Sequence, residues 1–550
     1  MDYDRNTAAW WKEPQVLFLL LIVFLAHFYR LDVVSVRGEE PRRIAIGQEM
    51  LRTGDWIVPQ IQGEPVFFRP PLQNWLIGLS IAAHGGTSHW SVRFPGIMAV
   101  LLTCLLLYGY GRRYLGPLGA FSAAAAYATM AQVMELGKLA ETETIFTFLI
   151  CATLLTWHWG FTSGWSDSRL WMTAYAVAGL GALAKGLQAP VYLLTASALY
   201  LIWSGSWRRI FTVGHALGLL TFGVVFGLWF FPYLARMGWH NSVLTVVGET
   251  TMRLDYSDHD EVIRHLWLYP LWVLSCMLPW SLFLIGYVRS DLRAALGDAS
   301  PMLRFAASAI LISFPTCYAI PSANARYFMP LYPCVALLVG LVIERSILAA
   351  EGTSLRRHWT WMMAGTGLVL IGLALCFQFG PAVGITSPVL DAQPSQQLLL
   401  FTLATAALGC LILFYRRAVN EIPIMALAIL FALTGSVVCQ NMVRFNSIEV
   451  ESPVAALKEK VPDDAPFYSF GPVNHRFAYY FDRPIRVISW TPPQTDLPSI
   501  DSYFCFEVDR PEKGPPSPLA FNWKKVGILW MDRYPHQKES FVIVGQRILP

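Results

Sequence analysis

Long apolar runs recur along the chain up to residue 443, separated by short polar stretches. The first run, 16–28, follows a short polar N-terminus and has no small-residue cleavage site after it, which predicts a retained signal anchor. Twelve further runs of membrane-spanning length lie at 94–111, 116–135, 143–162, 170–186, 188–203, 210–235, 265–288, 303–320, 326–344, 359–379, 397–415 and 423–443. The pattern predicts a polytopic α-helical membrane protein with thirteen transmembrane helices.

The positions of the basic residues predict how these helices are oriented across the membrane. Short cytoplasmic loops are enriched in Lys and Arg, and one assignment places five arginine clusters of the short loops on that side: 112–113, 208–209, 289 with 293, 345 with 356–357, and 416–417. With the N-terminus cytoplasmic, three long segments fall outside: 31–93, 236–264 and everything after 443. This topology requires the apolar stretch 70–86 to lie in the membrane interface as a juxtamembrane helix.

The composition changes after residue 444, where a small soluble domain is expected. Runs typical of strands and one helical stretch predict an α/β fold for it: strands at 467–470, 485–490, 503–508 and 541–544, and a helix at 476–480. The predicted domains are therefore a transmembrane catalytic domain, 1–444, and a periplasmic domain, 445–550.

Composition excludes several classes of protein. Hydrophobic residues make up 55% of the 550 positions and charged residues only 14%, whereas soluble proteins have roughly 45–50% and about 25%. The net charge of +4 is too small for an electrostatic nucleic-acid binder. The nine cysteines show no disulfide framework and no metal-ligand spacing.

The first outer segment, 31–93, carries adjacent carboxylates, Glu39 and Glu40, just after a membrane helix. Ionisable groups at a membrane boundary suggest a functional site. The alternative is that both carboxylates are solvated and that Pro41 begins a helix with acidic residues at its N-terminus.

Two other boundaries carry charge. Lys138 and Glu143 lie between two predicted helices, and we expect Glu143 and Glu39 to flank one cavity with Lys138 near them; alternatively, Glu143 caps the next helix in a solvated turn. Lys185 interrupts an apolar stretch, so it either extends to the interface or meets an anionic headgroup.

The second outer segment, 236–264, supplies further candidates. Its Glu249 and Arg253, with Arg264, suit a solvated loop or a phosphate-binding loop. His259 and the adjoining His265 are the candidate metal ligands, although their spacing matches no standard metal motif.

Phosphate-cradling glycine loops and nucleophile elbows are absent from the sequence, which excludes ATP-driven transport and serine hydrolysis. A lipid-linked activated donor would supply the driving force instead, because its phosphate leaving group needs only cationic stabilisation. Nothing in the sequence requires a cofactor, and no motif supports a divalent metal ion.

Three blocks of the first outer segment carry a resemblance: Glu-Glu-Pro-Arg at 39–42, Gly-Asp-Trp at 54–56 and Arg-Pro-Pro at 69–71. They resemble the Asp-Glu-x-Arg-Tyr, Gly-Asp-Trp and Lys-Pro-Pro blocks of the bacterial GT-C membrane glycosyltransferases, the lipid A aminoarabinose transferases and their protein-mannosyltransferase relatives. Further similar blocks follow in the same order: 93–95, 111–116, 137–140 with Glu143, 184–186, 278–281, and Arg326-Tyr327 with Pro330.

The chain departs from the family pattern at four positions. Glu39 and Glu143 stand where Asp is usual, and Arg69 stands where Lys is usual, so the charge is kept at these three positions. Arg43 stands where the family has Tyr. Because such changes alter reach within a pocket, the sugar and the acceptor do not follow from these residues.

The resemblance implies a polyprenyl-phosphate-dependent glycosyltransferase of the inner membrane that acts on the periplasmic face with inversion. The sugar would be one such as 4-amino-4-deoxy-L-arabinose, and the acceptor lipid A or a related envelope glycan. Glu39 would be the base, with Glu40 and Glu143 positioning the substrate. The remaining substrate-binding candidates are Arg42, Asp55, Arg69, Lys138, Lys185, Glu249, Arg253, Arg326 and Tyr327.

Two other functions fit the same charges. In a transporter or flippase for a lipid-linked sugar, the charged residues would line a path. Discontinuous helices and inverted repeats would favour that alternative, and the sequence shows neither. A structural membrane subunit is the other alternative, and the ordered acidic and basic clusters argue against it.

Overall fold

A computed structural model describes residues 7–549 except 34, 252–258, 321–322, 380–392, 416–420, 446–448, 491–500, 511, 513, 520 and 532–539. The chain forms two compact units. The first comprises Met1–Tyr29, Phe67–Gln73 and Arg93–Cys439, and the second comprises Arg30–Val66, Asn74–Val92 and Gln440–Pro550.

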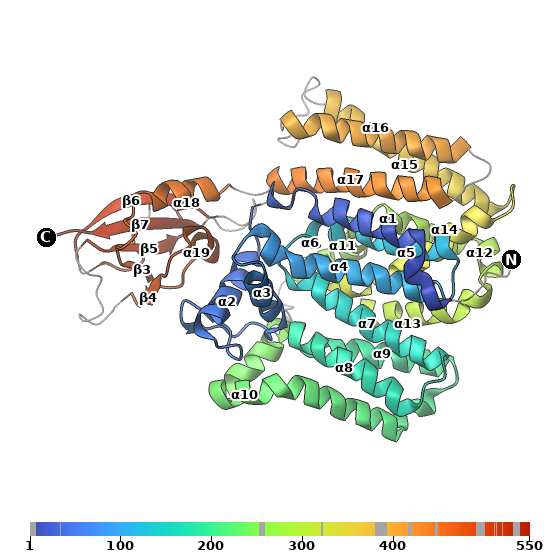
Figure 1. Ribbon diagram of the computed structural model, residues 1–550, viewed down its shortest axis with the longest axis horizontal. Helices are drawn as coiled ribbons and strands as arrows, with labels where there is room; N and C mark the ends of the chain where they lie inside the picture. The colour runs from blue at the N-terminus through green and yellow to red at the C-terminus, as the bar shows by residue number, and fades with distance from the viewer. Residues whose placement is uncertain are drawn as a thin grey trace. The chain divides into compact units, whose positions relative to one another are not determined.

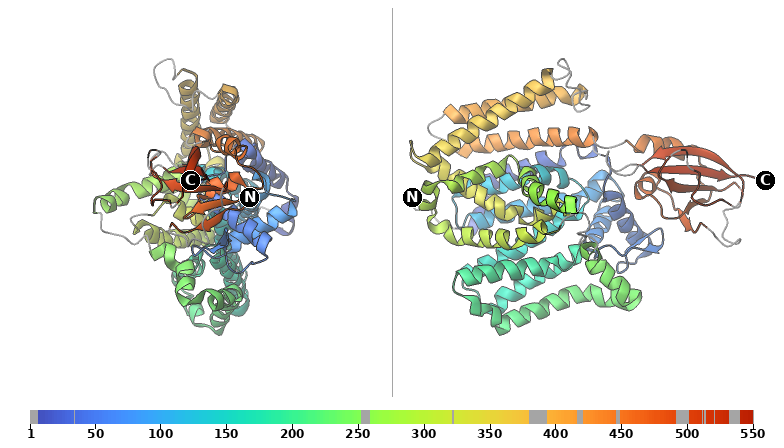
Figure 2. Two further views of the ribbon diagram at one scale, coloured as in Figure 1. Left: turned by 90° about the vertical axis from the view of Figure 1, so that its left-hand side faces the viewer. Right: turned by 180° about the vertical axis from the view of Figure 1, so that it is seen from behind.

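The first unit is a bundle of helices (Figure 1). Its described helices are α1 (Pro14–Val23), α4 (His89–Gly111), α5 (Pro117–Thr129), α6 (Ala131–Leu136), α7 (Thr142–Thr162), α8 (Asp167–Lys185), α9 (Gln188–Trp203), α10 (Val213–Thr251), α11 (His259–Cys276), α12 (Ser290–Ala294), α13 (Ser300–Tyr318), α14 (Tyr332–Leu348), α15 (Ser354–Phe379), α16 (Gln393–Tyr415) and α17 (Glu421–Phe445). Two 3₁₀ segments belong to the same bundle: η5 (Trp280–Val288) and η7 (Ala325–Leu331). Helices α8 and α10 run side by side (Figure 2).

Each predicted apolar run coincides with helix in the described residues, but not every helix is long. Six described helices are long and apolar enough to cross a membrane, or seven if one bent pair is counted as a span. The other helices that coincide with predicted spans do not meet this criterion of length and hydropathy over their described residues, so the number thirteen stays a prediction. Helix α3 (Leu72–Ala83), in the stretch predicted to lie in the interface, has 12 residues, which is too few to span the hydrocarbon core.

Three predictions about helix continuity were wrong. The run 116–135 is not one helix, because Met130 has an extended backbone between the end of α5 and the start of α6. The run 265–288 is not one helix, because α11 and η5 meet at a bend of 110°, and Pro279 between them has no N–H with which to continue a helix. The segment 236–264 is not an open loop, because its described residues are mostly helical. Helix α10 continues to Thr251 past a non-helical Gly238, and α11 begins at His259.

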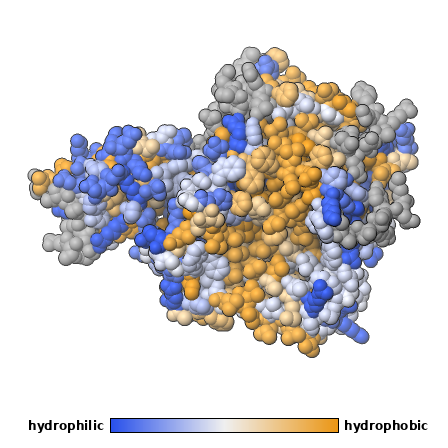
Figure 3. All heavy atoms as spheres, in the orientation of Figure 1, coloured by the Kyte–Doolittle hydropathy of each residue, from blue (hydrophilic) through white to orange (hydrophobic). Residues whose placement is uncertain are grey.

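The visible face of the first unit is broadly apolar, whereas polar residues gather over the sheet of the second unit (Figure 3). Large exposed apolar side chains on these helices include Leu228 at 76% and Trp267 at 77% exposure. Such a surface is unfavourable in water and is typical of helices that face lipid.

The second unit contains a mixed five-stranded sheet with the order β4-β3-β5-β7-β6. Its strands are β3 (Phe467–Phe470), β4 (Arg486–Ile488), β5 (Tyr503–Val508), β6 (Trp523–Trp530) and β7 (Phe541–Arg547). Strand β3 pairs in parallel with β4 and β5, and β7 pairs antiparallel with β5 and β6. The four predicted strands are confirmed, but β6 was missed because its adjacent Lys524 and Lys525 hide the alternation of a half-buried strand.

Helices α18 (Glu451–Lys458) and α19 (His475–Phe481) belong to this domain, and Phe477 and Phe481 contribute to one apolar core of the sheet. The first outer segment packs with the same unit. It forms α2 (Glu40–Thr53) and a short hairpin of β1 (Gln60–Ile61) and β2 (Glu64–Pro65). The backbone N–H of Val36 donates to the Tyr480 hydroxyl at 2.8 Å, so segments more than 400 residues apart in sequence share one fold.

Candidate active site

An ion cluster in the first unit, buried except for the partly exposed Arg326, comprises Glu141, Glu143, Lys185, Arg326 and Arg69. The Lys185 Nζ lies 3.3 Å from Glu143 Oε1, and these two side chains are only 5% and 3% exposed. The Arg326 Nη1 lies 3.0 Å from Glu141 Oε2, and its Nε lies 3.8 Å from Glu143 Oε1. Arg69 is buried and acts electrostatically on Glu143.

Helix ends hold this cluster in place. Glu141 is the residue that precedes α7 and Glu143 lies in its first turn, whereas Lys185 is the last residue of α8. Carboxylates at a helix N-terminus and a cation at a C-terminus both interact favourably with the helix dipoles. Arg326 lies in η7, where its backbone N–H donates to the capping Asn324 Oδ1.

Gly186 fixes the position of Lys185. Its φ is +79°, and a Cβ at this position would come within 2.5 Å of the Val246 carbonyl oxygen on α10. Only glycine combines this backbone angle with so close an approach. The end of α8 therefore packs directly on α10.

Among the described residues, the ion cluster brings together three cations, Lys185, Arg326 and Arg69, and two carboxylates. Burying unequal charge is costly unless a ligand balances it. The Lys185 ammonium also lies over the rings of Tyr327 and Phe146, at 5.2 and 5.5 Å from their centres. The arrangement suits an anionic group such as a phosphate, bound beside an aromatic wall.

Lys138 is also buried in the first unit, in the turn between α6 and α7. The expected cavity flanked by Glu143 and Glu39 joins residues of different units, so it stays a prediction.

In the second unit, Glu39 and Glu40 occupy different environments. Glu39 is 25% exposed and its Oε2 lies 2.8 Å from the Arg42 Nη1. Glu40 is fully buried at the start of α2, and its Oε2 accepts a hydrogen bond from the Arg37 N–H. The alternative expectation is therefore confirmed for the helix, which begins at Glu40 with Pro41 in its first turn, but it was wrong in that Glu40 is not solvated. Glu39 is the carboxylate that a substrate can reach.

Asp55, predicted to bind substrate, makes hydrogen bonds within its own loop. Its carboxylate accepts from the backbone N–H groups of Ile57 and Val58 and from the Gln60 amide. Such an Asx turn holds a loop in shape. These contacts favour a structural role for Asp55.

Glu249, Arg253 and His259 come from the second outer segment, and His265 adjoins it. Arg253 lies outside the described residues, as do the side chains of Glu249 and His259. His265 is buried in α11 with its ring 4.7 Å from that of Tyr269. Within the described part of the chain, no three His, Cys, Asp or Glu residues gather closely enough to hold a metal ion.

Sequence reasoning missed Glu141 as a site residue, although it forms the shortest ion pair of the cluster. The sequence does contain a clue to Glu141. It lies two residues before Glu143 at a predicted helix start, where a single carboxylate is enough to cap the helix, so the second carboxylate needs another explanation. The buried pair Arg37 and Arg476 in the second unit was missed as well, because nothing in a sequence brings together residues so far apart.

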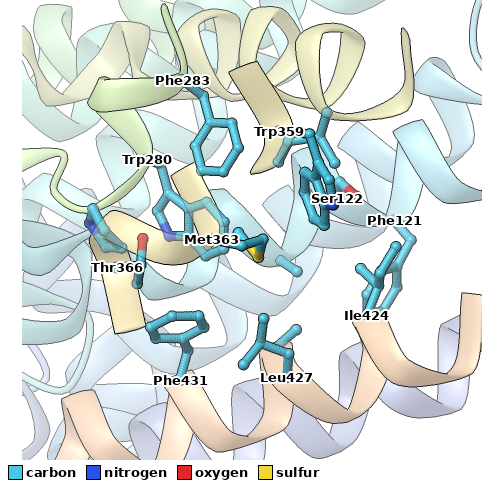
Figure 4. A pocket seen from close by; sticks show the side chains of 14 residues that line it. Phe121, Ser122, Trp280, Phe283, Trp359, Met363, Thr366, Ile424, Leu427 and Phe431 are labelled. Carbon is cyan, nitrogen blue, oxygen red and sulfur yellow. The ribbon is translucent and has the colours of Figure 1, made fainter. Parts of the chain in front are cut away.

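An apolar pocket lies between α5, η5, α14, α15 and α17 in the first unit (Figure 4). Aromatic side chains form much of its wall: Phe121, Trp280, Phe283, Trp359 and Phe431. None of its described lining residues is charged, so these residues do not supply the groups that would bind a phosphate.

Comparison with known proteins agrees with the motif resemblance. Residues 68–234 match the family model of dolichyl-phosphate-mannose-protein mannosyltransferases. The undecaprenyl phosphate-alpha-4-amino-4-deoxy-L-arabinose arabinosyl transferase of Pseudomonas paraeruginosa is 28% identical over 79% of this chain and 78% of its own length. The transferase of the same name from Edwardsiella ictaluri is 25% identical over 81% and 80%.

The fold is shared with solved structures. ArnT from Cupriavidus metallidurans bound to undecaprenyl phosphate superposes with a TM-score of 0.70 at 18% identity, covering 96% of this chain and 97% of that one. Its apo state gives 0.71. The predicted GT-C resemblance and fold class are confirmed, and the chain is a multi-pass membrane protein.

Proposed function

We propose that this chain is a GT-C-type glycosyltransferase that transfers 4-amino-4-deoxy-L-arabinose from undecaprenyl phosphate to lipid A or a related envelope acceptor. It acts in the bacterial inner membrane, with its N-terminus in the cytoplasm and its site on the periplasmic face. The names of the relatives supply the sugar and the carrier. The arginine pairs of the short loops support the orientation.

The observation that carries this proposal is the ion cluster with its excess of cations. A glycosyl phosphate needs its leaving phosphate neutralised as the bond to the sugar breaks. Lys185 and Arg326 are held rigidly by their ion pairs, so little reorganisation is required when that charge develops. Arg69 adds a third cation to the same cluster.

The reaction is a displacement at the anomeric carbon. An acceptor oxygen attacks that carbon, the bond from the carbon to the phosphate oxygen breaks, and undecaprenyl phosphate leaves with the electron pair. Glu39 takes the acceptor's proton, because it is the partly exposed member of the acidic pair. Attack opposite the leaving phosphate inverts the configuration.

The alternative of a transporter draws on one feature, the broken helix formed by α11 and η5. Discontinuous helices of transporters place charged or polar groups along a path. Here Pro279 and Trp280, at the break, line the apolar pocket, whose described lining residues carry no charge. The broken helix therefore does not favour transport.

The test is transfer by the purified full-length protein in proteoliposomes. Undecaprenyl-phosphate-linked aminoarabinose and lipid A are supplied, and the lipid products are identified by mass spectrometry. Aminoarabinose-modified lipid A is expected only when protein and donor are both present. Donor that crosses the bilayer without any modified acceptor would identify a transporter instead.

A further inference from the structure

A second charged site lies in the second unit, where the first outer segment meets the C-terminal domain. A small pocket is lined there by Arg37, Gly38 and Pro41 of the outer segment and by Asn474, His475, Arg476 and Met531 of the C-terminal domain. All seven residues belong to the second unit. Arg37 and Arg476 are 9% and 7% exposed, so two guanidinium groups are largely buried at one pocket.

Hydrogen bonds fix both walls of this pocket. The Asn474 side chain accepts from the backbone N–H groups of Arg476 and Phe477, which sets the start of α19. The Arg476 Nη2 donates to Ser35 Oγ at 3.4 Å, across to the outer segment. On that segment the Arg37 N–H donates to Glu40. The Arg476 guanidinium and the backbone of Arg37 are therefore placed before any ligand arrives, which lowers the entropic cost of binding a ligand.

The charges around Arg476 indicate that an anion bound in this pocket would be stabilised. Burial lowers the pKa of the Arg476 guanidinium, and the positive charge of Arg37 lowers it further, while Tyr480, Glu449 and Glu40 oppose that shift. Glu449 is exposed, where solvent screens it. A buried cation disfavoured by its surroundings is stabilised when an anionic ligand binds.

We propose that this pocket binds a phosphate group of the acceptor glycolipid, so that the C-terminal domain takes part in recognising the acceptor. Arginine presents a planar fork of donors that matches phosphate oxygens, and two forks suit a dianion. Gly38, with φ +62°, places a wall without a side chain at the pocket.

The position of the pocket connects it to the acidic pair. Gly38 and Pro41 line it, and Glu39 and Glu40 lie between them in the chain. A phosphate held here places the rest of the glycolipid close to Glu39, the carboxylate proposed as the base. The identity of the ligand rests on the proposed function, whereas anion binding does not.

The test measures binding by full-length protein in nanodiscs, with a diphosphorylated lipid A, its dephosphorylated counterpart and inorganic phosphate as probes. The variants are Arg476→Gln and Arg37→Gln. Lys524→Gln, an exposed lysine on β6, is the control with the same loss of charge. We expect each arginine variant to weaken binding of the phosphorylated lipid at least tenfold, and the control to bind like the wild type.

Two outcomes would overturn the proposal. One is equal binding of the phosphorylated and dephosphorylated lipids by the wild type. The other is inorganic phosphate binding as tightly as the glycolipid, which would assign the pocket to the free anion. The two arginine variants change different segments, so a folding failure of one leaves the other as a test.

Transfer kinetics separate this proposal from the proposed function. In the folded variants the apparent KM for the acceptor should rise at least fivefold while the KM for the donor is unchanged. A chain that binds the phosphorylated lipid through these arginines but transfers no sugar would refute the enzyme and leave the pocket standing. Active variants with an unchanged acceptor KM would refute the pocket alone.

Discussion

At the residue scale, adjacent acidic residues have separate roles because burial differs between them. Glu40 is fully buried and accepts the Arg37 N–H, so it supports the start of α2. Glu39 keeps a quarter of its side chain exposed beside Arg42. A base must be reachable by the acceptor, and only Glu39 of this pair meets that condition.

Glu39→Gln is expected to lower the rate of transfer by about 10²–10⁴-fold, the usual contribution of a general base, with little effect on folding because the amide has nearly the same shape. The measurement is kcat in proteoliposomes, with the thermal midpoint recorded alongside. Glu64→Gln, a change at an exposed position of β2, is the control. Near-normal turnover by purified Glu39→Gln would move the role of base to Glu143 or Glu40.

Lys185→Ala is expected to raise the apparent KM for the donor about ten- to hundredfold, because a hydrogen bond to a charged group contributes roughly 1.5–3 kcal/mol. The KM for the acceptor should change little. Glu143 keeps Arg326 as a partner at 3.8 Å, so the variant is expected to fold. The measurement is a titration of the donor, and Lys525→Ala on β6 is the control. An unchanged donor KM and rate would show that Lys185 does not hold the donor.

At the element scale, the ends of helices place the charges of the ion cluster. The start of α7 brings two carboxylates to the end of α8, and η7 supplies the arginine that pairs with both. Gly186 permits this by letting α8 end directly against α10. A few short connections thus set the distances between charged groups.

Gly186→Ala should therefore destabilise the protein strongly, since the new methyl group would meet the Val246 carbonyl at a strained backbone angle. Gly205→Ala is the matched control: its φ is also positive at +69°, but nothing lies within 4 Å of its Cβ position. The control should lower the free energy of unfolding by only about 1–2 kcal/mol, which is the energy that a residue with a Cβ needs to adopt the left-handed conformation. Thermal unfolding and transfer rate are measured for both, and equal losses would show that the contact with α10 is unimportant.

At the scale of the whole molecule, the proposed function depends on which loops face the periplasm. The short loops with arginine pairs are assigned to the cytoplasm, and the second unit is assigned to the periplasm. The clustered charges can serve a periplasmic reaction only if these assignments hold.

Cysteine labelling in a background without native cysteines tests the topology. Ser204→Cys, near Arg208 and Arg209, should resist membrane-impermeant thiol reagents in intact spheroplasts and react after permeabilisation. Asp501→Cys, exposed in the second unit, should react in both. Labelling of the two positions from the same side would refute the proposed topology.

The sequence by itself determined the apolar helices, four of the five strands of the C-terminal sheet and the charged candidates at the helix boundaries. Periodicity and hydropathy are local properties, so they can be recognised without knowledge of the fold. The motifs likewise singled out Glu143, Lys185 and Arg326 individually.

Only the tertiary structure decided which of these residues meet. Glu141 pairs with Arg326 across 185 positions of the chain, and Arg37 shares a pocket with Arg476. It also decided that Asp55 serves its own loop and that the helix at 265–288 breaks. Contacts between distant segments depend on how helices pack and on the direction in which each one ends, and neither is encoded in any short stretch of sequence.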